Sequence, residues 1–242
     1  MPKVTKAVIA AAGLGSRMFP FAKVESKLMI PILNKPIVEY LIEELVASGI
    51  KEVIIVANHT AKIKQFFIEN KNLNLLLKRL KKDKLLKNLH HIEHSAKVDL
   101  IMQEEPMGWM HEVVHAKDYI KKEPFVVCFS DTLYTSPIPA AKQVIDAFHK
   151  TNKNIRSLGR FLFKPYVLEI AQKERFMLGK DVADLDVFEK LKERNDLFNL
   201  NINGKFHDVG NPLSYLKTQT YFGLHNKILR RAYGEYLKDI IK

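Results

Sequence analysis

Apolar runs of strand length alternate with amphipathic segments along the first half of the chain. The apolar runs cover residues 6–10, 53–56, 98–102 and 125–129. Helical spacing of apolar side chains lies between them, at residues 37–48, 60–67 and 108–119. Strands that are connected through helices lie parallel in one sheet, because each crossover returns the chain to the same end. The pattern therefore predicts an α/β fold with parallel strands and crossover helices.

The second half of the chain has a less regular pattern. It predicts a strand over residues 155–163 and a hairpin over residues 197–206, around Asn203-Gly204. Helices are expected at residues 137–150, 182–194, 212–222 and 228–240. In the first half, the leucine-rich and lysine-rich segment of residues 72–91 predicts an amphipathic helix with a charged face.

Length and charge narrow the possible partners. The 242 residues have room for one large domain, or for one domain with a small appendage. The formal net charge of +12 favours anionic ligands such as nucleotides, sugar phosphates, nucleic acid or an acidic surface. Cys128 is the one cysteine, and its apolar surroundings predict a core residue and a cytoplasmic protein without disulfides. Neither a membrane span nor a signal peptide is expected.

A glycine-rich loop follows the first predicted strand. Gly13 and Gly15 sit among small residues, and Arg17 and Lys27 come within the next turns. Small residues let backbone N–H groups approach a ligand closely, and the two cations suit a polyphosphate. The loop lacks the Gly-Lys-Ser/Thr of a P-loop, and Met18 stands where a dinucleotide-binding motif has its third glycine. We therefore predict a phosphate-binding loop of another kind.

Two carboxylates follow strand-like segments. Asp131 comes directly after the apolar run 125–129, and ligands of open α/β sheets gather at such strand ends. Asp208 also follows a strand-like run and precedes a predicted helix. Either residue alone could be a turn or capping aspartate. Together they predict a Mg²⁺ site, because Mg²⁺ takes one or two carboxylates and completes its sphere with phosphate and water.

Gln103 and Gly108 form a third group. The amide of Gln103, at the end of a predicted strand, could read a base edge, because it donates and accepts hydrogen bonds at once. Gly108 would let the backbone approach that base. The histidines show no metal-ligand spacing with cysteines, so no zinc site is predicted.

These residues, in this order, resemble the bacterial UTP–glucose-1-phosphate uridylyltransferases of the sugar nucleotidyltransferase family. The matching residues are 11–20, 27–31 and 34–37, then Gln103 with 108–113, then Ser130-Asp131, 159–161 and 207–211. The resemblance implies a Rossmann-like three-layer sandwich with a mixed, mostly parallel central sheet. It implies one nucleotidyltransferase-like domain over residues 1–242, with a nucleotide-binding part (1–150) and a truncated sugar-binding and C-terminal helical part (151–242).

The resemblance also implies a reaction. A uridylyl group would pass from UTP to glucose 1-phosphate, whose phosphate oxygen attacks the α-phosphorus in line and releases pyrophosphate. Carried over residue by residue, the nucleotide-binding residues would be Ala11, Ala12, Gly13, Gly15, Gln103 and Gly108. The catalytic residues would be Arg17, Lys27 and Asp131, of which Arg17 and Lys27 hold the triphosphate. Asp131 and Asp208 would bind Mg²⁺.

The match breaks in the sugar-binding middle region. Between Asn154 and Leu158 the family has several dozen further residues, which include a Glu-Lys-Pro that binds the sugar and its phosphate. Lys164 and Lys180 are candidates to replace that lysine. A smaller phosphorylated acceptor such as phosphocholine, and a regulatory nucleotide-binding paralogue with impaired catalysis, stay open as alternatives. So does a homo-oligomer. Nucleic-acid binding through residues 72–91 is a further hypothesis and is not favoured.

Overall fold

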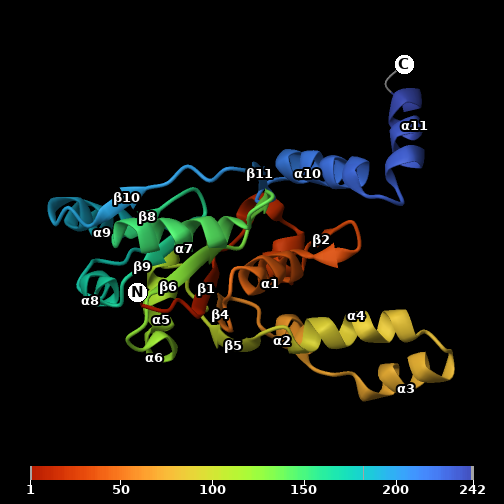
Figure 1. Cartoon of the computed structure of the whole chain (residues 1–242), viewed down its shortest axis with the longest axis horizontal. Coiled ribbons are helices and arrows are strands. Elements are labelled where there is room, and N and C mark those ends of the chain that lie inside the picture. The colour runs from red at the N-terminus through yellow and green to blue at the C-terminus, as the bar shows by residue number, and fades with distance from the viewer. Residues whose placement is uncertain (1, 182, 241–242) are drawn as a thin grey trace.

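Figure 1 shows the computed structural model of the chain, which describes residues 2–181 and 183–240. The strands are β1 (Lys6–Ala11), β2 (Pro31–Ile32), β3 (Lys35–Pro36), β4 (Glu52–Ala57), β5 (Lys97–Met102), β6 (Phe125–Phe129), β7 (Thr132–Thr135), β8 (Asn154–Arg156), β9 (Arg160–Phe163), β10 (Leu197–Asn199) and β11 (Lys205–Asp208). The helices are α1 (Ile37–Ala47), α2 (Ala61–Phe67), α3 (Lys71–Arg79), α4 (Asp83–His94), α5 (Trp109–His115), α6 (Lys117–Ile120), α7 (Ala140–Thr151), α8 (Tyr166–Ala171), α9 (Ala183–Glu193), α10 (Pro212–His225) and α11 (Arg230–Ile240). Short 3-10 helices follow β1: η1 (Ser16–Met18), η2 (Phe21–Lys23) and η3 (Lys27–Met29).

One mixed sheet runs through the middle of the molecule. Within the described residues it has seven strands, in the order β10-β8-β9-β6-β1-β4-β5. β1 pairs in parallel with both β4 and β6, and β4 pairs in parallel with β5. β9 runs antiparallel to its two neighbours, β6 and β8. The predicted three-layer α/β fold with a mixed, mostly parallel sheet is therefore confirmed.

Helices cover both faces of this sheet, because its strands carry apolar side chains on both sides. Helices α1 and α7 pack on one face, where Ile9 of β1 and the fully buried Cys128 of β6 point. Helices α5, α6, α8 and α9 pack on the other face, where Val8 points. Cys128 is a core residue, as predicted. Among the described residues, none of the helices combines the length and the apolar character that crossing a membrane requires.

Several predictions about the secondary structure are wrong. The strand expected over residues 155–163 is the hairpin of β8 and β9, which turns at Gly159, where φ is 66° and glycine is favoured. The hairpin expected over residues 197–206 does not form, because β10 pairs with β8 while β11 pairs with β7. The helix expected over residues 72–91 is two helices, α3 and α4, since the chain reverses near Lys81, whose φ is 55°.

The helix expected over residues 108–119 is two helices, α5 and α6, and the ends of α7, α10 and α11 differ by one to three residues from their predictions. Of the helix expected over residues 182–194, residue 182 lies outside the described residues, and α9 covers Ala183–Glu193.

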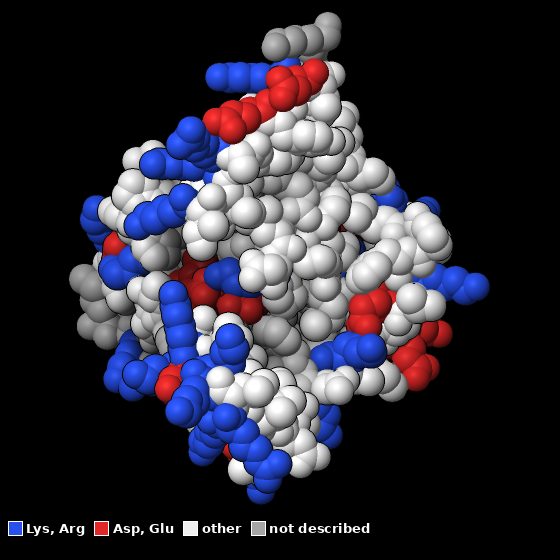
Figure 2. Space-filling view, turned by 90° about the vertical axis from the view of Figure 1, so that its right-hand side faces the viewer, with Lys and Arg blue, Asp and Glu red and all other residues white. Residues whose placement is uncertain are grey.

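Helices α3 and α4 form an arm that projects from the sheet-containing body (Figure 1). Lysine and arginine side chains gather over this part of the molecule, at the lower end of Figure 2. The arm and its turn carry Lys71, Lys78, Arg79, Lys81, Lys82, Lys84 and Lys87. Much of the charge surplus therefore lies on the arm, as the charged face predicted for this segment requires.

Arg160 of β9 is a fully buried cation. Its Nε and Nη2 donate to the two carboxylate oxygens of Glu44 on α1, each at 2.8 Å. Arg160 Nη2 also donates to the carbonyl oxygen of Thr132 at 3.0 Å, and Glu44 accepts from the backbone N–H of Ala141 at 2.9 Å. This ion pair joins α1, α7 and β9 to the first residue of β7.

Arg160→Met is expected to lower the free energy of unfolding by about 3–5 kcal/mol, because Glu44 is left as a buried charge without its partner. The double variant Arg160→Met/Glu44→Leu should recover most of that loss. Urea denaturation measures both. The control is Arg231→Met, which breaks the exposed Arg231–Glu235 pair and should change stability by less than about 1 kcal/mol. A loss for Arg160→Met as small as that of the control would contradict the role of the ion pair.

Candidate active site

A cleft of about 340 Å³ opens at the carboxyl ends of β1 and β6. Its walls come from the loop after β1, from η1 and η3, from the segment between β5 and α5, and from the end of β6. Residues 179–181 and Gly210 complete the walls. The lining residues are Ala10, Gly13, Leu14, Gly15, Ser16, Arg17, Lys27, Pro106, Gly108, Trp109, Glu112, Phe129, Ser130, Asp131, Gly179, Lys180, Asp181 and Gly210. The cleft therefore contains the glycine-rich loop and one of the two predicted metal carboxylates.

Neighbouring parallel strands bring the glycine-rich loop and Asp131 to the same edge. Ala10 of β1 lies opposite Phe129 of β6, and the N–H of Ser130 donates to the carbonyl oxygen of Ala10 at 3.2 Å. The strand ends are thus in register where the loop begins. Lys27 Nζ reaches across the cleft and pairs with Asp131 Oδ2 at 3.2 Å.

Asp208 reaches the same place through a different strand pairing. It is the last residue of β11, which runs antiparallel to β7, and its register partner there is Thr132. The N–H of Val209 donates to the carbonyl oxygen of Asp131 at 2.9 Å, which continues the ladder by one step. Two residues that are distant in the chain are therefore brought side by side by main-chain hydrogen bonds.

Gly210 marks the point where the charged side chains converge. A Cβ atom added to Gly210 would lie 3.0 Å from Asp131 Oδ2, and 3.1 Å from both Arg17 Nη2 and Asp208 Oδ1. The Asp208 carboxylate is oriented by its own loop, since it accepts from the N–H of Gly210 and from Asn211 Nδ2, each at 2.7 Å. The structure therefore places Arg17, Asp131 and Asp208 around a single position that has no side chain of its own.

Gly15 allows Lys27 to reach the cleft. Its φ of 61° favours glycine, and a Cβ there would lie 2.9 Å from Lys27 Cδ. The stem of Lys27 runs along the loop in the space that Gly15 leaves. The amine of the same side chain ends 4.0 Å from the Cβ position of Gly13. The Lys27 side chain therefore packs along the loop, with its stem at Gly15 and its amine near Gly13.

The donor set around Gly210 fits a Mg²⁺ ion. Carboxylate oxygens are the ligands that Mg²⁺ prefers, and each oxygen of Asp208 can accept a second interaction beside its hydrogen bond. Among the described residues, no group of three or more His, Cys, Asp or Glu side chains could hold a metal ion by itself. Water and phosphate oxygens would have to complete the coordination sphere, as is usual for Mg²⁺.

The residues expected to read the base lie beside the cleft or at its edge. Gln103 is buried, its Nε2 donates to the carbonyl oxygen of Glu105 at 2.9 Å, and its Oε1 lies 3.1 Å from His111 Nδ1. Gly108 does line the cleft. A Cβ on Gly108 would lie 2.9 Å from Asp181 Oδ1, so a protein segment already approaches it. The base-reading roles of Gln103 and Gly108 stay predictions.

Ala11 and Ala12 are buried under the loop. The N–H of Ala12 donates to Glu112 Oε2 at 3.0 Å, so this nucleotide-binding candidate already has a protein partner. Glu112 lines the cleft from α5, and sequence reasoning did not single it out. The available signal was an acidic residue between Met110 and Val113, on the apolar side of a predicted helix.

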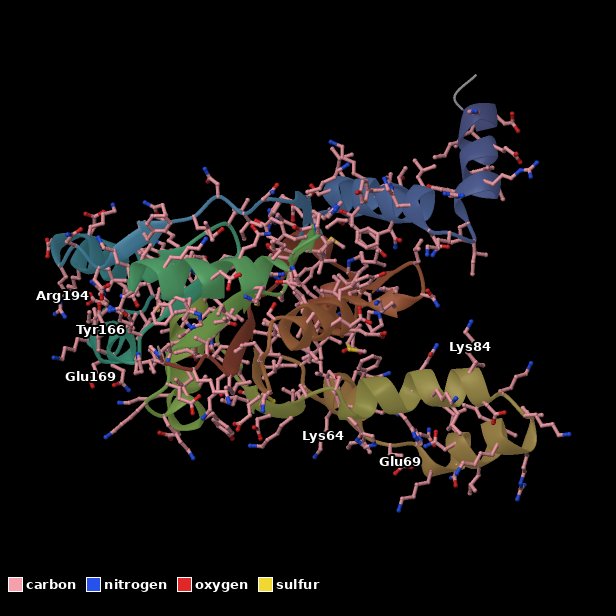
Figure 3. All side chains as sticks on the ribbon, viewed as in Figure 1. Lys64, Glu69, Lys84, Tyr166, Glu169 and Arg194 are labelled. Carbon is pink, nitrogen blue, oxygen red and sulfur yellow. The ribbon has the colours of Figure 1, made fainter. Side chains whose placement is uncertain are left out.

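The two lysines proposed to replace the missing sugar-phosphate lysine differ in their surroundings. Lys180 lines the cleft. Lys164 instead donates to both carboxylate oxygens of Asp196, each at 3.0 Å. Asp196 also accepts from the hydroxyl of Tyr166, which Figure 3 places with Arg194 at the far left end of the molecule. Only Lys180, of these two, is in a position to meet a ligand in the cleft.

The chain is similar in sequence to known proteins over its whole length. The chain is 28% identical to the UTP–glucose-1-phosphate uridylyltransferase of Bacillus subtilis over 287 aligned positions, which cover 100% of this chain and 98% of that protein. It is 27% identical to UTP–glucose-1-phosphate uridylyltransferase 1 of Staphylococcus saprophyticus, over 99% of this chain and 100% of that protein. Both alignments are longer than the chain, so these relatives have segments that this chain lacks, as the shortened middle region predicts.

Solved structures show the same fold. A UTP-bound UGPase from Acinetobacter baumannii superimposes with a TM-score of 0.88 at 21% identity, over 97% of this chain and 99% of that one. A UDP-glucose pyrophosphorylase from the same organism gives a TM-score of 0.89 at 21% identity, over 98% and 100%. A sequence model of the family described as Nucleotidyl transferase matches residues 6–157, which is more than half of the chain and includes the glycine-rich loop and Asp131. The chain therefore belongs to the nucleotidyl transferase family.

Proposed function

We propose that this protein transfers a uridylyl group from UTP to a sugar 1-phosphate, with glucose 1-phosphate as the first candidate, and releases pyrophosphate. An oxygen of the sugar phosphate forms a bond to the α-phosphorus of UTP while the bond to the pyrophosphate oxygen breaks. The observation that supports this most is the convergence of Arg17, Asp131 and Asp208 around Gly210, beside a glycine-rich loop. The names of the relatives supply the substrate pair.

The residues of the glycine-rich loop and the charged residues around Gly210 have these roles in the proposal. Gly13 and Gly15 carry the loop against the triphosphate, with Ala11 and Ala12 behind them, and Arg17 and Lys27 neutralise the charge that develops on the leaving pyrophosphate. Asp131 and Asp208 would hold Mg²⁺, which would supply positive charge to the phosphate oxygens. In this structure Lys27 Nζ lies 3.2 Å from Asp131 Oδ2, so the ion pair holds the Asp131 carboxylate in the cleft.

A regulatory nucleotide-binding protein and a transferase with a smaller acceptor would use these residues differently. A regulatory nucleotide-binding protein has little need of two converging carboxylates, so their arrangement favours an enzyme. A smaller acceptor such as phosphocholine would use the same nucleotide half and differ only where the acceptor binds. The cytoplasmic location and the homo-oligomer also stay predictions.

Glu112 is a buried acid in the part of the cleft where we place the nucleotide. Burial raises its pKa to about 8, although the N–H of Ala12 and the charge of Lys27 act in the opposite direction. At neutral pH the carboxyl group is therefore mostly protonated and adds no negative charge next to the phosphates. Above pH 8 it ionises and repels them.

Asp131→Asn and Asp208→Asn are each expected to lower Mg²⁺-dependent pyrophosphate release by at least about 100-fold, because each removes a charged metal ligand. Pyrophosphate release with UTP and glucose 1-phosphate is the measurement, and circular dichroism checks that the fold is retained. The matched control is Asp146→Asn on α7, which only breaks an ion pair with Lys142 on the surface. Turnover of either cleft variant at the level of the control would contradict the proposed metal site.

The affinity for UTP should fall as the pH rises through 8, by roughly 3- to 10-fold between pH 7.5 and 9, because ionised Glu112 opposes the triphosphate. Glu112→Gln cannot ionise and should bind UTP with little change over that range. Calorimetry at constant ionic strength measures the dissociation constants. If wild type and Glu112→Gln show the same pH dependence, Glu112 does not titrate beside the nucleotide.

A further inference from the structure

Helices α3 and α4 pack against each other as a hairpin, and this arm projects from the sheet-containing body (Figure 1). Leu77 of α3 and Leu86 of α4 are buried in the arm, each with only 9% of its surface exposed. Asn74 Nδ2 donates to Glu69 Oε1 at 3.1 Å, which attaches α3 to the segment before it. These contacts hold the hairpin together without its exposed leucines.

Within residues 71–90, five leucines lie at the surface. Their exposed fractions are between 38% and 56%, and they are Leu73, Leu75, Leu76, Leu80 and Leu85. Leu73, Leu76 and Leu80 are spaced i, i+3 and i+7, so they lie on one face of α3, which we call the leucine face. An apolar face of this kind indicates a partner that takes up apolar side chains.

The same segment is strongly cationic. Residues 71–90 contain seven lysine and arginine residues and one acidic residue, Asp83. Residues 78–82 place four of these cations around Leu80, and Lys84 lies at the outer end of the arm (Figure 3). The positive charge and the exposed leucines therefore occur together, at the part of the arm that is farthest from the body.

An anionic lipid surface matches both properties, whereas the other partners match one. The arm of a second copy would cover leucines but would be repelled by its like charge. A nucleic acid would pair with the cations but leave the leucine face in water, and residues 71–94 contain no Phe, Tyr or Trp on which bases could stack. In a bilayer the leucines enter the boundary between headgroups and acyl chains, while lysine side chains reach the lipid phosphates.

We propose that the arm attaches the protein reversibly to a membrane surface that is rich in anionic lipids. The leucine face supplies apolar burial, and the cations of residues 71–90 supply the attraction to the lipid headgroups. Reversible attachment needs both, because either contribution by itself gives only marginal binding. No residue of the arm lines the cleft, so this inference goes beyond the proposed transfer reaction and does not depend on it.

The test measures how the full chain partitions onto lipid vesicles in a flotation assay. Wild type should bind at least about tenfold more tightly to phosphatidylcholine vesicles with about 30 mol % phosphatidylserine than to pure phosphatidylcholine vesicles. Added salt should weaken this binding, because it screens the cations.

Two double variants separate the contributions of charge and apolar burial. Lys78→Glu/Lys82→Glu and Leu76→Ser/Leu80→Ser should each weaken binding to the phosphatidylserine vesicles by about tenfold or more. All four side chains are exposed, so both variants should fold, which circular dichroism checks.

The matched controls make the same changes on the body of the protein. Lys122→Glu/Lys150→Glu alters two exposed lysines, and Ile138→Ser/Leu185→Ser alters two apolar side chains that are 54% and 60% exposed. Both controls should bind the vesicles within about threefold of wild type.

Three results would overturn the proposal. The first is equal binding of wild type to the two kinds of vesicle. The second is a loss in the arm variants that is no larger than in their controls. The third is binding to random duplex DNA that depends on Lys78 and Lys82, or self-association that depends on Leu76 and Leu80, without any preference for the phosphatidylserine vesicles.

Discussion

The antiparallel pairing of β11 with β7 brings two acidic residues that are far apart in the sequence to one edge of the molecule. β7 begins directly after Asp131, and β11 ends at Asp208 opposite Thr132. The pairing adds no strand to the main sheet, so its consequence is local: it positions two carboxylates and the Gly210 turn beside the glycine-rich loop. Without it, the cleft would keep one carboxylate and lose the pair on which the metal site depends.

The buried ion pair between Arg160 and Glu44 holds β7 in the position where it pairs with β11. Arg160 bonds both to Glu44 and to the carbonyl oxygen of Thr132, so the strand that presents Asp131 is attached to α1 and β9. An unpaired charge in that position would be costly, because neither partner has water to replace the other. A second ion pair lies in the glycine-rich loop. There the stem of Lys27 fills the space beside Gly15, and its amine pairs with Asp131.

The sequence predicted strands β1, β4, β5 and β6 and the helices α1 and α2 well, because strands and helices alternate there and each has a clear period. The sequence did not predict which strands β10 and β11 pair with. Residues 197–206 look like a hairpin locally, yet β10 and β11 join different sheets, and no local pattern encodes that choice. Lys81 and Gly159 break predicted elements through positive φ values that composition alone does not show. The cleft residues Gly13, Gly15, Arg17, Lys27 and Asp131 could be found from motifs, whereas Glu112 became visible only through its burial at the cleft.

A crystal structure with UTP and Mg²⁺ tests the central claim most directly. The account predicts the triphosphate against residues 13–17 and a metal ion about 2.1 Å from a carboxylate oxygen of both Asp131 and Asp208. A triphosphate bound elsewhere on the protein, or a metal ion that touches neither carboxylate, would contradict it.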